Sequence, residues 1–191
     1  IFSATDSDGK WGVYRSQNGM LEKLVNADTT PPSPLSGEPP NAPFGYFSDT
    51  DYRNGNLVFQ SGSGIFMRKT DGSLVTIVNI NTPIPNDPSG GTRVFMWDVN
   101  IASGDVIFKW GSDWGLGIFR WNESAGLSNI VDRAIGAAGI GEVVTDAEGN
   151  LAFELGDAIY LDTIADLDPY QRIVGNGDQL AIEDFPVNAT R

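Results

Sequence analysis

Short stretches in which apolar and polar residues alternate recur along the chain, and they predict β-hairpins. Alternation with a period of two places every second side chain on one buried face of a strand, and a polar turn joins two such strands. Three copies begin with glycine, an aliphatic residue and an aromatic residue: GVYRSQNGMLEKLV at 12–25, GIFMRKTDGSLVTIV at 64–78 and GIFRWNESAGLSNIV at 117–131. A fourth copy, AIYLDTIADLDPYQRIV at 158–174, has alanine in place of the glycine and a longer turn.

Two further alternating stretches precede each of the last three hairpins. The nearer ones are NGNLVF at 54–59, SGDVIF at 103–108 and EGNLAF at 148–153, and the earlier ones are FGYFSDTDY at 44–52, RVFMWDVN at 93–100 and IGEVVTD at 140–146. Each unit is therefore a meander of four short strands, which is the size of a propeller blade. The predicted complete blades span approximately 44–79, 93–132 and 140–175.

The two ends of the chain supply the parts of a fourth unit. Residues 1–25 match 107–131 strand for strand but lack a first strand, whereas LAIEDFPVNATR at 180–191 resembles a first strand and has nothing after it. One small sheet cannot bury both its faces, so such units stack around an axis. We therefore expect one all-β domain over 1–191, a four-bladed β-propeller in which 180–191 pairs with 1–25 to complete one blade.

Two alternatives to this closed ring stay open. The chain is cut from a longer protein with more blades, or closure takes place between neighbouring molecules and produces a polymer.

Composition agrees with a β-rich chain and excludes several kinds of chemistry. The 191 residues include 23 glycines and 11 prolines, and 12 basic against 25 acidic residues give a net charge of −13. Such a charge repels phosphate backbones, so nucleic acid is not an expected partner. The chain has neither cysteine nor histidine, which excludes a thiolate nucleophile, a Ser-His-Asp triad and a cysteine- or histidine-ligated metal. No apolar run is long enough to predict a transmembrane helix.

The repeat resembles repeats of bacterial secreted and surface proteins. The pattern that carries the resemblance is G-x-[LV]-x-F, then G-[IV]-[FY], then G-x-L-x-x-[IL]-V, with phenylalanine-rich segments such as FGYF between units. The resemblance covers nearly the whole chain. The chain departs from it in the fourth hairpin, and it lacks the P-x-I-N motif that those repeats have before the glycines corresponding to Gly55 and Gly149. It implies a propeller-like module that is secreted or displayed at the cell surface, and it assigns no catalytic residue.

Closely spaced aspartates are the first candidate site. Asp6 and Asp8, and likewise Asp49 and Asp51, have the D-x-D spacing that lets two carboxylates converge on calcium. Neither stretch matches the twelve-residue calcium loop, however, and Asp-Gly and Asn-Gly pairs also form hairpin turns because they tolerate positive φ. We expect turns at these positions and keep calcium as the alternative.

Tryptophans are the second candidate site. Trp110 and Trp114 flank a glycine-rich hairpin tip, and with Trp11 they are the residues that we expect to stack on a sugar ring or to insert into a partner. Trp97 and Trp121 are expected in the core between blades.

The expected function is therefore binding rather than catalysis. Hairpin tips and the long connections at 26–44 and 79–92 would hold a glycan or a protein, because loops on a rigid scaffold are where ligands bind. A glycosidase carboxylate pair is not expected in a ring this small. The alternative is a structural protein that assembles into filaments or layers by β-strand exchange between copies.

Overall fold

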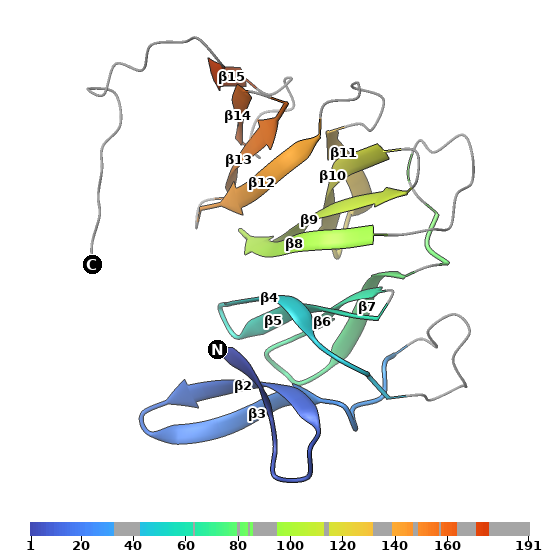
Figure 1. The fold of residues 1–191 in the computed structure, drawn as a ribbon, viewed down its shortest axis with the longest axis vertical. Coiled ribbons are helices and arrows are strands. Elements are labelled where there is room, and N and C mark those ends of the chain that lie inside the picture. Colours follow the sequence, from blue (N-terminus) through green and yellow to red (C-terminus); the bar gives the residue numbers. More distant parts are fainter. Residues whose placement is uncertain are drawn as a thin grey trace.

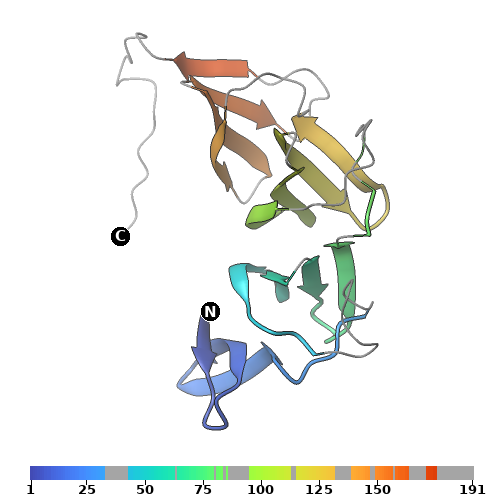
Figure 2. The same ribbon diagram turned by 45° about the vertical axis from the view of Figure 1, so that its right-hand side comes forward.

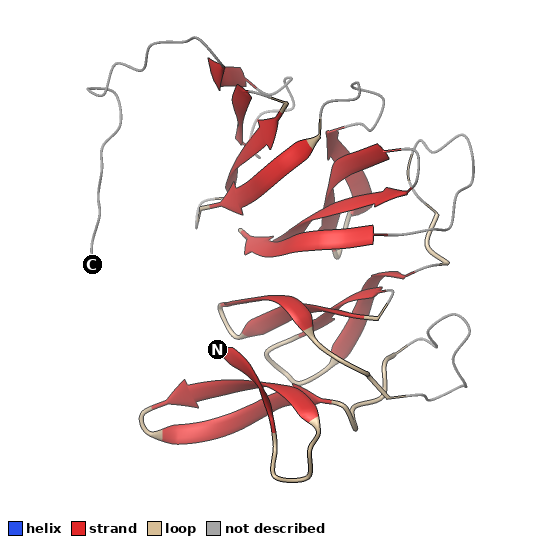
Figure 3. Ribbon diagram, in the orientation of Figure 1, coloured by secondary structure: helices blue, strands red, loops and turns tan. Residues whose placement is uncertain are grey.

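The protein consists of short antiparallel strands. The computed structural model describes residues 1–32, 43–62, 64–79, 81–83, 85, 95–112, 115–131, 139–146, 149–156, 158–163 and 171–175. Strands make up all the regular secondary structure in these ranges, and no described segment is a helix that could span a membrane (Figure 3). The all-β prediction is confirmed.

The strands form four separate sheets that follow one another along the chain (Figure 1). Sheet A has three strands and the others have four, each in simple meander order. Sheet A comprises β1 (Phe2–Thr5), β2 (Trp11–Gln17) and β3 (Met20–Asn26); sheet B, β4 (Ser48–Arg53), β5 (Asn56–Ser61), β6 (Gly64–Arg68) and β7 (Leu74–Asn79); sheet C, β8 (Phe95–Ala102), β9 (Asp105–Ser112), β10 (Gly115–Asn122) and β11 (Gly126–Val131); and sheet D, β12 (Ile140–Thr145), β13 (Asn150–Leu155), β14 (Ala158–Thr163) and β15 (Gln171–Gly175).

Two-residue turns close several of the hairpins. Asn18-Gly19, Asn54-Gly55 and Ser103-Gly104 each have positive φ at both residues, between 50° and 89°. This is the type I′ turn, whose twist matches that of the flanking strands and which asparagine and glycine adopt at low cost. The predicted turns at the two Asn-Gly pairs are confirmed.

The glycine of the G-[IV]-[FY] motif makes room for the aromatic ring two residues later. A Cβ on Gly64 would lie 2.7 Å from Cζ of Phe66 and 3.2 Å from the carbonyl oxygen of Val78. Gly12 and Gly117 meet the same two obstacles, an aromatic ring and a valine carbonyl. In sheets A, B and C the motif therefore records a close approach between the glycine, the aromatic ring two residues later and the last strand of the sheet.

Each sheet carries the same stacked aromatic pair, across the second and third strands of sheets B, C and D and across β1 and β2 of sheet A. The ring centroids are 5.5–6.1 Å apart and the ring planes are 15–28° from parallel. The pairs are Phe2–Tyr14, Phe59–Phe66, Phe108–Phe119 and Phe153–Tyr160. The repeat seen in the sequence is therefore a repeat of side-chain packing as well as of backbone.

Three hydrophobic cores hold the sheets together in a row. The first core joins sheet A to sheet B: Val13, Leu24 and Val25 pack on Leu57, Phe59 and Phe66. The next core joins sheet B to sheet C around Ile65 and Phe108, and the third joins sheet C to sheet D around Ile118 and Phe153. Figures 1 and 2 both show the row as a curved arc with sheet A and sheet D at its opposite ends.

The described strands form four open sheets and no closed ring. In sheets B, C and D a first strand (β4, β8 or β12) pairs with the second strand (β5, β9 or β13). In sheet A, β1 occupies the place of that second strand, and no first strand pairs with it among the described strands. Residues 180–191, which we expect to fill that place, lie outside the described residues. Closure into four blades therefore stays a prediction.

Candidate functional site

Polar side chains join the first strands of sheets B, C and D. Asp51 of β4 accepts a hydrogen bond from the backbone N–H of Ile101 in β8 at 2.8 Å, and it forms an ion pair with Arg53 at 3.1 Å. Asn100 of β8 then donates to the carbonyl of Val143 in β12 at 3.5 Å. We call this set, with the residues of the next paragraph, the axial cluster, because it follows the strands on which the three sheets converge.

Two cations extend the axial cluster from sheet to sheet. Arg53 donates to the carbonyl oxygens of Asp146 at 2.9 Å and Thr145 at 3.3 Å, so it reaches from the first hairpin of sheet B to that of sheet D. Lys109 forms an ion pair with Asp98 and donates to the carbonyl of Gly141 at 2.9 Å. These charge-assisted bonds tie together sheets that are far apart in the sequence.

Each first strand places an acidic residue where its pairing is irregular. Asp49, Asp98 and Glu142 all lie at register shifts, and the first two have positive φ, of 41° and 53°. Burial raises the pKa of the Asp49 carboxyl, the carboxylate of Asp98 raises it further, and Lys109 lowers it. Bulges of this kind re-aim a side chain out of the regular alternation.

The axial cluster is a set of bonds between sheets. Both oxygens of Asp51 accept backbone N–H groups, from Tyr52 and Ile101, and that carboxylate also faces Arg53. Over the described ranges, no group of three or more Asp or Glu side chains is arranged to hold a metal ion. These bonds join sheets B, C and D to one another.

The predicted pair Asp6 and Asp8 lies in the turn between β1 and β2. Oδ1 of Asp6 accepts hydrogen bonds from the backbone N–H groups of Asp8 at 3.0 Å and Lys10 at 2.9 Å. The carbonyl of Asp6 accepts from Gly9, whose φ is 78°. The turn interpretation is confirmed here, and calcium binding by this pair stays a prediction.

For the stretch that holds Asp49 and Asp51, the turn interpretation is confirmed at the Asn-Gly pair, and the two aspartates lie in the strand predicted at 44–52. Both residues lie within β4, where Asp51 pairs with Val58 of β5. The turn begins only at Asn54, where Asn54 and Gly55 both adopt positive φ and form the two-residue turn, whereas the positive φ of Asp49 belongs to the irregular pairing of β4. Calcium binding by this pair too stays a prediction.

The structure separates the predicted tryptophans. Trp110 is fully buried, with its ring edge-on to Phe119 at 5.2 Å, so the expectation that it lies at the surface is wrong. Strand β9 continues to Ser112, which keeps Trp110 inside the sheet and turns it towards sheet B. Trp114 lies outside the described residues. Trp121 packs against the core as expected, Trp97 lies in β8, and Trp11 is exposed to 48%.

A second aromatic residue, Tyr46, is exposed and was not expected from the sequence. The carbonyl of Trp11 accepts the N–H of Ala27, where the connection from sheet A to sheet B begins, and the carbonyl of Thr29 accepts the N–H of Phe44, where that connection returns. Tyr46 follows and is exposed to 53%, whereas Phe44 and Phe47 are buried. We call this region, with the turn at 6–10, the loop end. The signal available in the sequence was the motif FGYF, in which a tyrosine stands between two phenylalanines.

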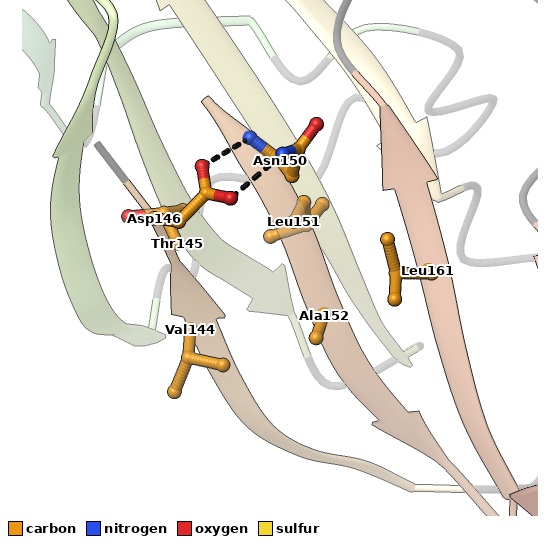
Figure 4. A pocket seen from close by; sticks show the side chains of 7 residues that line it. All are labelled: Val144, Thr145, Asp146, Asn150, Leu151, Ala152 and Leu161. Carbon is orange, nitrogen blue, oxygen red and sulfur yellow. Dashed lines mark hydrogen bonds between the residues drawn. The ribbon is translucent and has the colours of Figure 1, made fainter. Parts of the chain in front are cut away.

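Sheet D carries a shallow hollow on its outer face (Figure 4). Its volume is about 420 Å³, and its lining is mostly apolar. Two hydrogen bonds from Asn150 to the carboxylate of Asp146, at 2.7 and 2.8 Å, close one rim. The lining residues are Val144, Thr145, Asp146, Asn150, Leu151, Ala152 and Leu161.

The comparisons with known proteins concern the fold alone. No family model and no curated protein sequence matches the chain. A prolyl endopeptidase structure matches with a TM-score of 0.53 at 11% identity, over 91% of this chain and 26% of that chain. The tricorn protease matches with a TM-score of 0.49 at 14% identity (94% and 18%), and streptogramin B lyase with 0.31 at 14% (90% and 67%).

This chain is an all-β protein of propeller-like fold. It spans only about a quarter of the prolyl endopeptidase chain that it matches. Because the fold alone is shared, that protein's activity does not carry over to this chain.

Proposed function

We propose that this chain is a non-enzymatic extracellular module that binds a glycan or a protein at its loop end. The observation that supports this function most is the presence of two exposed aromatic side chains, Trp11 and Tyr46, at one end of the packed sheets. Exposed rings on a rigid scaffold offer large contact area at low entropic cost.

Polar groups beside these rings complete the proposed site. Lys10 and Asp28 form an ion pair at 2.6 Å across the loop end, and both side chains are exposed. A sugar presents apolar C–H groups on its ring face and hydroxyl groups around its rim. The aromatic rings would contact the C–H groups. The carboxylate of Asp28 would accept hydrogen bonds from the sugar hydroxyl groups, and the ammonium group of Lys10 would donate hydrogen bonds to them.

Catalysis by carboxylates has less support than binding. Asp49 and Asp98 are the carboxylates that influence each other in the axial cluster, and Asp98 is engaged by Lys109. A glycosidase needs one carboxyl group as proton donor and a second as nucleophile or base, both facing the substrate. The hollow on sheet D has one carboxylate, Asp146, which already accepts two hydrogen bonds.

A glycan array tests the proposal. The full chain and its Trp11→Ala/Tyr46→Ala double variant would be compared at equal concentration, with Met20→Ala as the matched control. Met20 is exposed to 73% in the turn between β2 and β3, at the opposite end of sheet A. We expect the wild type and the control to retain the same oligosaccharides and the double variant to lose them. Equal retention by all three, or by none, would contradict a glycan site at the loop end; loss by both variants would point to another surface.

The four-bladed ring is the finer architecture that we propose for this module. In support of it, β1 pairs only with β2 among the described strands, whereas β5, β9 and β13 each pair with a first strand as well. Residues 180–191 of the same chain would fill that edge, because an unpaired edge strand is a template for another strand.

The same open edge favours a second candidate function, self-assembly by strand exchange. If residues 180–191 pair with β1 of a neighbouring copy, the chain forms filaments or layers. Electron microscopy distinguishes the two cases. Fibres that grow with protein concentration would support strand exchange, and discrete particles would support the binding module.

A further inference from the structure

Two hairpin turns contain the same dipeptide, Asn-Gly, in the same conformation. Asn18-Gly19 joins β2 to β3, and Asn54-Gly55 joins β4 to β5. The φ angles are 53° and 76° in the first turn and 51° and 85° in the second. Because the dipeptide and its backbone conformation agree, a difference in reactivity between the two turns has to come from their surroundings.

An Asn-Gly dipeptide can react with itself, since glycine has no Cβ to hinder its backbone nitrogen. That nitrogen loses its proton and forms a bond to Cγ of the asparagine. The Cγ–Nδ2 bond breaks, and the amide nitrogen takes up a proton and leaves as ammonia. Water then adds to one of the two carbonyl carbons of the five-membered imide, which gives aspartate or isoaspartate. No oxidant or reductant takes part.

The imide ring closes only when the turn opens. The asparagine ψ of a type I′ turn is about 30°, which directs the glycine nitrogen away from the asparagine Cβ, whereas the ring needs both on the same side of the Cα–C bond. The asparagine carbonyl group therefore has to rotate before the reaction. The rate of the modification then depends on how easily each turn opens locally.

Thr70, in the turn between β6 and β7, holds the turn at Asn54-Gly55 closed. Its hydroxyl oxygen lies 3.3 Å from the carbonyl oxygen of Asn54 and 3.2 Å from Oδ1 of Asn56, within donating distance of both. Its backbone N–H donates to the same Oδ1 at 3.1 Å. Thr70 also packs closely on Gly55, where a Cβ would lie 2.7 Å from the hydroxyl oxygen. The carbonyl group that must rotate is thus the one that Thr70 contacts.

The turn at Asn18-Gly19 lacks such a partner in the described part of the chain. Residues 17–21 are all exposed, and a Cβ on Gly19 would meet no heavy atom within 4 Å. The strand pair Gln17 and Met20 closes this turn. Rotation of the Asn18 carbonyl group therefore displaces no packed side chain.

We propose that Asn18 is a site of spontaneous modification, at which water replaces ammonia through an imide formed with Gly19, and that Thr70 protects Asn54 from the same reaction. Isoaspartate routes the main chain through Cβ, so the turn gains an atom and loses the geometry that pairs Gln17 with Met20. Either product adds a negative charge to a chain whose net charge is −13.

The site is the same in an open arc and in a closed ring. Ring closure would pair residues 180–191 with β1, whereas this turn joins β2 to β3. The corresponding turns of sheets B and C, at 70–73 and 123–125, are exposed although both sheets pack against neighbours on either side. A sheet packed against sheet A would therefore leave Asn18 in contact with water.

Peptide mapping measures the two turns in one molecule. Trypsin places Asn18 on peptide 16–23 and Asn54 on peptide 54–68, or on 24–68 where cleavage after Arg53 fails. A third Asn-Gly pair, at 176–177 outside the described residues, falls on peptide 173–191. The folded chain, and the chain unfolded in guanidinium chloride, would be incubated in the same mildly alkaline buffer and followed by mass spectrometry.

We expect Asn18 to convert at least about fivefold faster than Asn54 in the folded chain, because the Thr70 contacts must break before Asn54 reacts. In the unfolded chain the two rates should be similar. Equal rates in the folded chain, a faster Asn54, or no conversion of Asn18 while the unfolded chain converts would each overturn the proposal.

The Thr70 hydroxyl group is tested by two variants that circular dichroism shows to be folded. Thr70→Ala should raise the Asn54 rate towards that of Asn18, whereas Thr70→Ser keeps the hydroxyl group and should leave Asn54 slow. An unchanged Asn54 rate in Thr70→Ala, or an equal rise in Thr70→Ser, would overturn the protective role. If Thr70→Ala does not fold, the comparison of folded and unfolded wild type decides alone.

Discussion

At the residue scale, the exposed large hydrophobic side chains of the described part are grouped and not scattered. Trp11 and Tyr46 lie at the loop end, Phe2 and Leu21 on sheet A, and Val144 and Ile159 on sheet D, which leaves Ile1 and Met20. Single exposed hydrophobics are normal on protein surfaces, but grouped ones mark interaction sites. The proposed function rests on the group at the loop end.

A substitution at the motif glycine tests the packing of the aromatic pair. Gly64→Ala puts a methyl group 2.7 Å from Phe66, and overpacking of this kind should lower the free energy of unfolding by about 1–3 kcal/mol. Urea denaturation measures the change. Gly45→Ala is the control, because a Cβ there meets no heavy atom within 4 Å, and it should stay within about 0.5 kcal/mol of wild type. Equal losses in both variants would contradict the close approach.

Residue-level predictions from the sequence succeed where the cause is local. Asn-Gly turns and the Asp6 turn follow from φ preferences of two or three residues, so the sequence contains the reason for them. The burial of Trp110 depends on how far β9 extends and on sheet B behind it. Neither is visible in a glycine-rich stretch that reads as a hairpin tip, and the prediction for Trp110 was wrong for that reason.

At the element scale, the repeat in the sequence predicts strand order and pairing because hairpins are local. The three four-stranded sheets have the meander order that this predicts. The axial cluster was not predictable, because its bonds between sheets join residues 32–93 positions apart along the chain, such as Lys109 with Gly141 and Arg53 with Asp146. Only the packed sheets bring them together.

Removal of the Arg53 side chain tests the link between sheets B and D. Arg53→Ala loses two hydrogen bonds to carbonyl groups and the ion pair with Asp51, which we expect to cost about 1–2 kcal/mol because the site is partly exposed. Hydrogen exchange should show faster exchange in β12. Lys69→Ala, which removes an ion pair with the exposed Glu123, should leave β12 unchanged. Faster exchange in both variants would show that Arg53 has no special role.

The pKa of Asp49 predicts a pH dependence of stability. Burial raises this pKa above its ordinary value, so between the two values the folded state binds more protons than the unfolded state, and stability falls as pH rises. Asp49 keeps an exposed side, so the effect is small. Asp49→Asn should remove it, giving a flatter stability curve between pH 4 and neutral pH. A steeper fall in the variant, measured by urea denaturation, would contradict the sign.

At the scale of the whole molecule, an all-β, propeller-like fold was predictable from the sequence, and the ligand was not. Repeats reveal architecture because each unit solves the same packing problem. Function depends on which faces and loop ends remain uncovered. Phe2 and Phe59 occupy the same position in the repeat, and only the neighbouring sheet decides that one is exposed and the other is buried.

The central claim, that the loop end binds the ligand, is tested most directly by titration calorimetry. The oligosaccharide retained most strongly by the wild type on the array would be titrated into the wild type and the Trp11→Ala, Tyr46→Ala and Met20→Ala chains. Loss of a central aromatic contact should weaken binding at least about tenfold, or about 1.4 kcal/mol, for Trp11→Ala and Tyr46→Ala. Met20→Ala should bind as the wild type does. Unchanged affinity in both aromatic variants would contradict the claim.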